Sequence, residues 1–195
     1  MFDPGGVVLG IDPGLSRCGY GVVSRAGSRL AATACGVIRT GPDDPLPKRL
    51  ALLAAELDAL VAEMRPMAIA VERVLFQVNA RTAMSVGMAS GLALAIAGRE
   101  GIPVVQYSPN EVKLAVAGDG GAGKEEVQQM VARLLGLREV PRPADAADAL
   151  ALAICHWWRA PMQAVVADYP RDGSRLESAI AAAMSRETMS RETGT

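Results

Sequence analysis

Short apolar runs at the start of the chain alternate with turn residues in a way that predicts three neighbouring strands. The run Val7–Asp12 is rich in β-branched residues and is followed by Pro13-Gly14. Gly19–Ser24 and Leu30–Thr40 have the character of a second and a third strand, and the loop Gly41–Pro45 follows them. The short connections between the three runs predict an antiparallel meander.

After this meander the apolar positions take the spacing of a helix. In Pro47–Met64, leucine, alanine, valine and methionine side chains recur on one helical face. Strands and helices then alternate along the chain, and the pattern predicts the strand Met67–Glu72, the helix Arg81–Arg99, the strand Ile102–Tyr107 and the helices Pro109–Ala117, Lys124–Leu135 and Ala144–Trp158. This order predicts an α/β fold, a mixed sheet with the meander and parallel strands, covered by helices on both faces.

Two boundaries follow from local composition. Ser108 is a good N-cap, because Pro109 follows at the first helical position and Glu111 stands at the third. Beyond residue 162 the chain becomes polar and ends in a duplicated Ser-Arg-Glu-Thr motif. We therefore expect one folded domain over residues 1–162 and a disordered tail over residues 163–195.

Composition narrows the setting without pointing to a function. Half of the 195 residues are hydrophobic and the formal net charge is −1, which is ordinary for a globular domain and argues weakly against a nucleic-acid partner. Cys18, Cys35 and Cys155 form no CxxC pair, and we expect lone buried thiols. No signal peptide and no membrane-spanning run is visible, so a cytoplasmic protein is expected.

Four carboxylates stand in places where a charge is costly. They close two predicted apolar strands or lie in an alanine-rich helix, and they are Asp12, Glu72, Asp145 and Asp148. Each has an ordinary explanation when taken alone: a turn residue, an ion pair with Arg73, a charge at a helix N-terminus, and a buried acid bonded to backbone. Asp145 and Asp148 share a helix face, and the two strand ends meet at one sheet edge if their strands are parallel neighbours.

Convergence of these four acids would require a cation between them, since like charges raise each other's pKa. Carboxylate oxygens suit Mg²⁺, with Mn²⁺ as a substitute, better than zinc. Two such ions can clamp the attacking and leaving oxygens of a phosphodiester, so the pattern indicates metal-assisted hydrolysis. The single histidine, His156, is better explained as a core or interface residue than as a base.

In this order the motifs resemble a known family. GIDPGLSRCGYGVV, AVERV, NARTAM and ADAADALALAICH are similar to the RuvC family of Holliday junction resolvases, over about three-quarters of the chain, from Val7 to His156. GIDPG alone is shared by several ribonuclease H-like folds, whereas the ordered set is highly specific.

The resemblance implies a ribonuclease H-like fold, a homodimer and an endonuclease that resolves four-way DNA junctions by symmetric, Mg²⁺-dependent hydrolysis in recombination and repair. It implies two ions per site and branch-migration proteins of the Ruv pathway as partners. The family's catalytic and metal-binding acids correspond to Asp12, Glu72, Asp145 and Asp148. Its basic DNA-binding positions near the site correspond to Lys113 and Lys124.

Further DNA contacts are expected around the carboxylate segments. Arg73 and Arg81 flank these segments and would contact phosphates, or are solvated charges. Family members often carry an aromatic wedge after the internal glutamate, but here Leu75 stands at that position and Phe76 follows. Either of them would serve as the wedge between unstacked bases, and the alternative for Phe76 is a dimer or core contact.

Other functions fit the sequence less well. Gly118–Lys124 begins like a phosphate-binding P-loop, but Glu125 stands where Ser or Thr is required, and a glycine loop presenting Lys124 to DNA is the better interpretation. An actin-type ATPase or phosphotransferase would need a second lobe. A nuclease of RNA precursors does not explain the DAADALA motif, and a non-catalytic junction-binding module does not explain four retained acids.

Overall fold

The computed structural model describes residues 6–73 and 80–168. Within them the chain forms one mixed sheet of five strands, β1 (Val7–Asp12), β2 (Arg17–Ala26), β3 (Arg29–Arg39), β4 (Ala68–Glu72) and β5 (Val104–Tyr107). The strand order is β3-β2-β1-β4-β5, in which β2 is antiparallel to both β1 and β3, and β4 is parallel to both β1 and β5. The predicted meander and parallel extension are thus confirmed.

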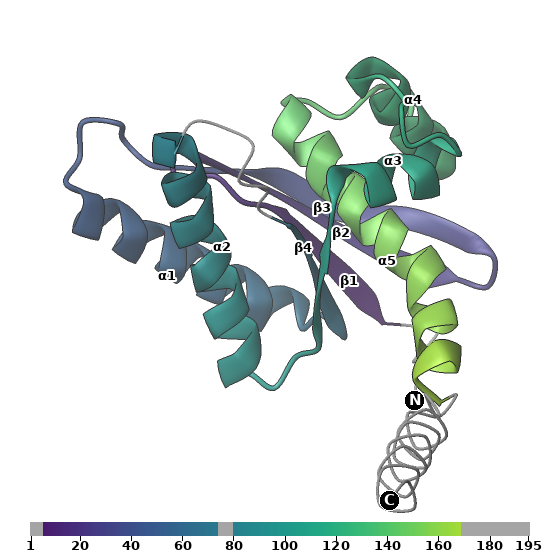
Figure 1. Ribbon diagram of the computed structural model, residues 1–195, viewed down its shortest axis with the longest axis horizontal. Helices are drawn as coiled ribbons and strands as arrows, with labels where there is room; N and C mark the ends of the chain where they lie inside the picture. The colour runs from purple at the N-terminus through teal and green to yellow at the C-terminus, as the bar shows by residue number, and fades with distance from the viewer. Residues whose placement is uncertain (1–5, 74–79, 169–195) are drawn as a thin grey trace, which may run out of the picture. The chain divides into compact units, whose positions relative to one another are not determined.

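Five helices of the described residues connect and cover the strands (Figure 1). They are α1 (Leu46–Met64), α2 (Ala80–Arg99), α3 (Pro109–Ala117), α4 (Lys124–Leu134) and α5 (Ala144–Asp168). The predicted capping box is present, because the Ser108 side chain accepts from the Glu111 backbone N–H and the Glu111 side chain accepts from that of Ser108. None of the helices within the described ranges combines the length and the apolar character needed to cross a bilayer.

Alternation along the strands separates two cores on opposite faces of the sheet. Leu9 and Ile11 of β1 face α1 and α2, where they pack with residues such as Leu53 and Leu57. Val8 of β1 faces the other way, toward α3, α4 and α5. Successive strand side chains point to opposite faces, so every second residue of β1 belongs to the α5 side.

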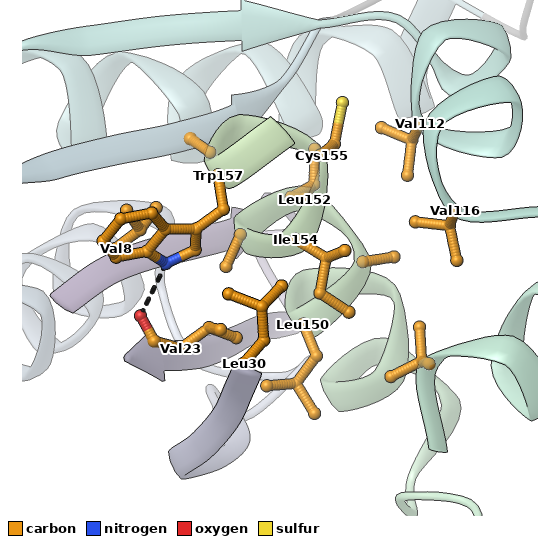
Figure 2. Close-up of a cluster of buried hydrophobic side chains, with 14 of the residues drawn as sticks. Val8, Val23, Leu30, Val112, Val116, Leu150, Leu152, Ile154, Cys155 and Trp157 are labelled. Carbon is orange, nitrogen blue, oxygen red and sulfur yellow. Dashed lines mark hydrogen bonds between the residues drawn. The ribbon is translucent and has the colours of Figure 1, made fainter. Parts of the chain in front are cut away.

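The core on the α5 face is anchored by Trp157, which is fully buried. Its indole Nε1–H donates to the Val23 carbonyl oxygen at 2.9 Å, and Val8, Leu30 and Ile154 surround it (Figure 2). A buried indole N–H requires such an acceptor. This bond ties the middle of α5 to strand β2.

Two expectations need correction. Helix α5 continues to Asp168, beyond the expected helix end at Trp158. The domain boundary at residue 162 and the disordered tail stay predictions, and residues 169–195 lie outside the described residues. The residues that follow Trp158 are mostly apolar and can continue the helix. Pro161 is the one helix-breaking residue among them, and it lies within the helix. Cys35 is exposed on β3, whereas Cys18 and Cys155 are buried free thiols. β3 is an edge strand whose outward side chains face solvent.

His156 is a core residue, as expected, since it is only 4% exposed. Its Nδ1 lies 3.0 Å from the Tyr107 hydroxyl oxygen, and burial lowers the pKa of the imidazole from 6.5 to about 4. The unfolded chain therefore takes up a proton below pH 6.5 that the native state refuses, and stability falls as pH decreases from 6.5 toward 4. We expect this group to cost about 2 kcal/mol of unfolding free energy between pH 7 and pH 5.

The measurement is direct because the chain has one histidine. Its imidazole proton resonances should remain those of a neutral ring down to about pH 5. The pH dependence of urea unfolding should weaken in His156→Gln, which keeps an acceptor for Tyr107. An imidazole that titrates near 6.5 in the folded protein would contradict this prediction.

Candidate active site

Strand alternation places Asp12 and Glu72 on the α5 face of the sheet. Val8, Gly10 and Asp12 alternate with Leu9 and Ile11 of the opposite core. In β4 the same alternation puts Glu72 on the face of Ala68 and Ala70. Ile11 is the register partner of Val71 in the parallel pair, so the next residues of the two strands, the two acids, lie side by side.

Three glycines allow α5 to lie directly against this part of the sheet. A Cβ on Gly10 would stand 1.9 Å from the Ala149 carbonyl oxygen, and one on Gly19 would stand 2.2 Å from the Asp145 carbonyl oxygen. A Cβ on Gly21 would also be too close, at 2.6 Å from the Leu150 backbone nitrogen. Only residues without a side chain permit this approach, which brings the first turns of α5 onto β1 and β2.

Helix α5 supplies the other two acids. Asp145 lies in its first turn and Asp148 one turn later, whereas the neighbouring Ala146, Ala147 and Ala149 are fully buried. Their side chains remain partly accessible, 26% for Asp145 and 23% for Asp148. Helix docking therefore turns a small part of the α5 surface toward the strand ends that carry Asp12 and Glu72.

The carboxyl groups of Asp12 and Glu72 share a hydrogen bond, which requires a proton on one of them. Burial raises the pKa of Asp12 to about 8, with further contributions from the charges of Glu72, Asp148 and Asp145. Burial also raises the pKa of Glu72, against the effect of the hydrogen bond from Asp12. Such a pair holds negative charge only at a high free-energy cost, which a nearby cation would relieve.

Two basic side chains neutralise Asp145 and Asp148 of α5. Lys124 Nζ lies 2.6 Å from Asp148 Oδ2. Arg17, at the start of β2, forms an ion pair with Asp145, whose pKa is lowered chiefly by the hydrogen bonds from this guanidinium. Sequence reasoning did not single out Arg17, although it lies within the motif segment and has the same strand parity as Gly19 and Gly21.

A cavity of about 400 Å³ opens at this place. Its charged lining consists of Asp12, Glu72, Asp148, Lys113 and Lys124. Its apolar lining is supplied by α3, α4 and α5, namely Pro109, Val112, Val127, Ala151 and Leu152. Three of the four predicted acids and both predicted lysines therefore meet at one cavity, while Asp145 stands beside it, paired with Arg17.

The acids are not grouped as a ready-made metal site. Across residues 6–73 and 80–168, no three histidine, cysteine, aspartate or glutamate side chains converge as a ligand set. Asp12 is hydrogen-bonded to Glu72, and Asp145 and Asp148 each form an ion pair with a basic side chain. A divalent ion would have to replace the shared proton and displace these basic side chains.

The other predicted contacts are placed unevenly. Arg73 is exposed directly after β4, and its guanidinium donates to the Gln106 carbonyl oxygen at 3.0 Å. Arg81 lies in the first turn of α2. Leu75 and Phe76 lie outside the described residues.

The glycine-rich segment before Lys124 is not a P-loop. It follows helix α3 rather than a strand, and Gly118 ends that helix in the left-handed conformation, with φ of 78°. The segment leads through the N-cap Gly123 into α4, whose first residue is Lys124. Its role in the fold is to deliver Lys124 to Asp148.

Comparison with known proteins identifies the family. The model of the family described as crossover junction endodeoxyribonuclease RuvC matches residues 8–156. The crossover junction endodeoxyribonuclease RuvC of Salinispora arenicola is 56% identical over 170 residues, covering 85% of this chain and 97% of the relative. That of Frankia alni is 54% identical over 155 residues, covering 79% of each chain.

Solved structures agree. Thermus thermophilus RuvC in complex with a Holliday junction substrate is similar with a TM-score of 0.77 and 41% identity, covering 81% of this chain and 96% of that one. The yeast mitochondrial Holliday junction resolvase shares the fold, with a TM-score of 0.56 at 19% identity, covering 76% of this chain and 77% of that one. The chain belongs to the RuvC family of crossover junction endodeoxyribonucleases.

Proposed function

We propose that this protein resolves four-way DNA junctions by hydrolysing two symmetry-related phosphodiester bonds, with Asp12, Glu72, Asp145 and Asp148 as its catalytic acids. The observation that carries the proposal is the cavity in which three of these acids meet Lys113 and Lys124. Acids to hold metal and lysines to hold phosphate are what phosphodiester hydrolysis needs at one place. Family membership supplies the junction as substrate.

The donor set fits a hard divalent cation. Its members are carboxylate oxygens, two of which share a proton at high cost, and the described residues that line the cavity include no cysteine or histidine. We propose Mg²⁺ as the metal, two ions per site, with Mn²⁺ as a substitute. When bound, the metal activates the attacking water and neutralises charge on the departing 3′ oxygen.

The chain's own residues then have separate tasks. Asp12 and Glu72 are rigidly held by adjacent strands, so they define where the metal is bound. Asp145 and Asp148 are held by one helix and complete the ligand set, or orient the water between them. Lys113 and Lys124 line the same cavity and would hold the phosphate against the acids.

DNA contacts beyond the cavity complete the proposal. Arg73 directly follows β4, and Arg81 lies in the first turn of α2. We propose that both contact phosphates beside the scissile bond. Leu75 or Phe76 is proposed as the wedge at the junction centre. Residues 1–162 would form the nuclease domain, acting in the cytoplasm.

Cleavage of two symmetric strands calls for two active sites, so we propose a homodimer that acts together with the branch-migration proteins of the Ruv pathway. The expected mass by light scattering at micromolar concentration is that of two chains. A strict monomer that still cuts both strands in concert would contradict the dimer.

Lys124→Ala is expected to weaken junction binding at every sequence and to reduce the slope of log affinity against log salt by about one. The assay is best made in the Asp12→Asn background, where bound DNA stays uncut. Lys48→Ala is the matched control. The side chain of Lys48, in the first turn of α1, is 71% exposed and forms an ion pair with Asp44, away from the cavity. An unchanged salt slope in Lys124→Ala would remove this lysine from the DNA interface.

One comparison of substrates tests the function. A labelled four-way DNA junction, plain duplex DNA, structured RNA and ATP are each offered with Mg²⁺ and with EDTA. Symmetric nicking of the junction alone, and only with metal, is the expected result. Hydrolysis of ATP, or trimming of RNA without junction cutting, would instead favour an actin-type phosphotransferase or an RNA-processing nuclease.

A further inference from the structure

We propose that Arg17 is a positioning residue that holds Asp145 in the metal-free enzyme and competes with the divalent cation for it. Arg17 thereby sets the cation concentration at which the site fills. This inference rests on the proposed function, in which Asp145 is part of the metal-binding acid set.

The first support is the geometry of the ion pair. Two donors of the guanidinium, Nε and Nη2, converge on the same oxygen of Asp145, Oδ2, with the Nε distance at 3.1 Å. The contact joins residues 128 positions apart in the chain. Both donors act on an oxygen that a metal ion would otherwise use.

The second support is that the backbone brings the two side chains within reach of each other. Arg17, Gly19 and Gly21 alternate along β2 and share the face that α5 covers. Gly19 approaches the Asp145 carbonyl so closely that no side chain fits between them. The first turn of α5 is therefore fixed over β2, within reach of the Arg17 side chain.

The third support is that the pair can open. The side chain of Arg17 is 43% exposed, and that of Asp145 is 26% exposed. An ion pair in contact with water is weak, so a doubly charged ion can displace the guanidinium. By contrast, the guanidinium of the neighbouring Arg49 donates to the hydroxyl groups of Thr40 and Ser16.

Lys124 and Arg17 each hold one acid of the proposed ligand set, and the described acids form no ready-made group of three. Asp145 and Asp148 are each neutralised by a basic side chain that would have to move as metal enters. Removing Arg17 leaves Asp145 uncompensated, and the more negative site should attract a divalent cation more strongly. One additional unit of negative charge beside a bound divalent cation raises the affinity of the site for that cation by about three- to tenfold.

The experiment measures Mn²⁺ binding without DNA, by electron paramagnetic resonance of the free ion at pH 7.5 and constant ionic strength. Arg17→Gln is expected to bind Mn²⁺ about three- to tenfold more tightly than the wild type. Arg17→Lys keeps the cation and should stay close to wild type. Unchanged or weaker binding in Arg17→Gln overturns the proposal.

Arg39→Gln is the matched control. Arg39 is the exposed cross-strand partner of Arg17, so its loss removes the same charge from the same end of the sheet. It should leave Mn²⁺ affinity within about twofold of wild type, as expected for an exposed charge with solvent screening. An equal gain in Arg39→Gln would mean that general charge, and not the contact with Asp145, is responsible, and would also overturn the proposal.

A double-mutant cycle completes the test. In an Asp145→Asn background the gain from Arg17→Gln should disappear, because the pair no longer exists; a gain that persists contradicts the proposal. Junction nicking is followed separately. If the wild type nicks the junction but Arg17→Gln binds Mn²⁺ no more tightly than the wild type, this inference alone is refuted. If Arg17→Gln binds Mn²⁺ more tightly but the wild type nicks no junction, the proposed function alone is refuted.

Discussion

Asp12→Asn is expected to abolish junction cleavage while leaving junction binding intact. Asp12 lies at the end of β1 beside Glu72, and the charges of Asp148 and Asp145 are close enough to raise its pKa. Replacing it removes one ligand charge worth several kcal/mol in the transition state, a loss of about a thousandfold in rate. Single-turnover nicking of a labelled junction measures the rate, and gel mobility measures the binding.

The same variant should be more stable than the wild type without metal. Since burial and neighbouring charge raise the pKa of Asp12 to about 8, the native state gradually loses stability as pH rises from 4 to 8. Asparagine does not ionise, so the stability advantage of the variant should widen over this interval. Urea unfolding with EDTA at pH 5 and pH 8 measures it.

Glu56→Gln is the control for both measurements. Glu56 is an exposed acid of α1, on the opposite side of the sheet. The Glu56→Gln variant should cleave the junction at the wild-type rate and unfold at the wild-type urea concentration. Cleavage retained within tenfold in Asp12→Asn would exclude Asp12 from the catalytic set, and loss of both binding and stability would mean that the substitution acts by unfolding.

The largest expected effect on stability belongs to Gly10→Ala. The new Cβ would stand 1.9 Å from the Ala149 carbonyl oxygen and 2.9 Å from the Ala153 nitrogen, both backbone atoms in the middle of α5. The helix must move away from β1, since no side chain can yield. Overpacking of this kind costs about 3 kcal/mol or more, and cleavage should fall because α5 carries Asp145 and Asp148.

Gly98→Ala is the matched substitution. Gly98 lies in α2, and a Cβ there meets nothing within 4 Å. This change should raise stability by about 0.5–1 kcal/mol through helix propensity. Urea midpoints of the two variants distinguish the predictions, and a Gly10→Ala protein as stable as the wild type would refute the close contact between β1 and α5.

Much of the fold was predictable from local pattern. Ser108, Pro109 and Glu111 form the capping box that their spacing indicates, because a helix start is decided by neighbouring residues. The strand Val7–Asp12 has the predicted bounds. The end of α5 at Asp168 was missed, because the sequence pattern predicts that this helix ends at Trp158.

The site was predictable only in part. Motif order and strand ends named Asp12 and Glu72, and parallel pairing of β1 with β4 places them together. The spacing of Asp145 and Asp148 indicated a shared helix face, as α5 has it. The exposure of Cys35 was not predictable, because it depends on β3 being an edge strand.

The sequence by itself indicated most of the elements, the candidate acids and the family, because helix and strand periods, caps and motifs are properties of neighbouring residues. Only the tertiary structure decided which charges meet. Arg17 reaches Asp145 across 128 positions, and Lys124 reaches Asp148, because glycines of β1 and β2 let α5 lie on the sheet. Spacing along a chain holds no information on such contacts, since they depend on how two elements dock, and docking is set by the packing of the whole sheet face.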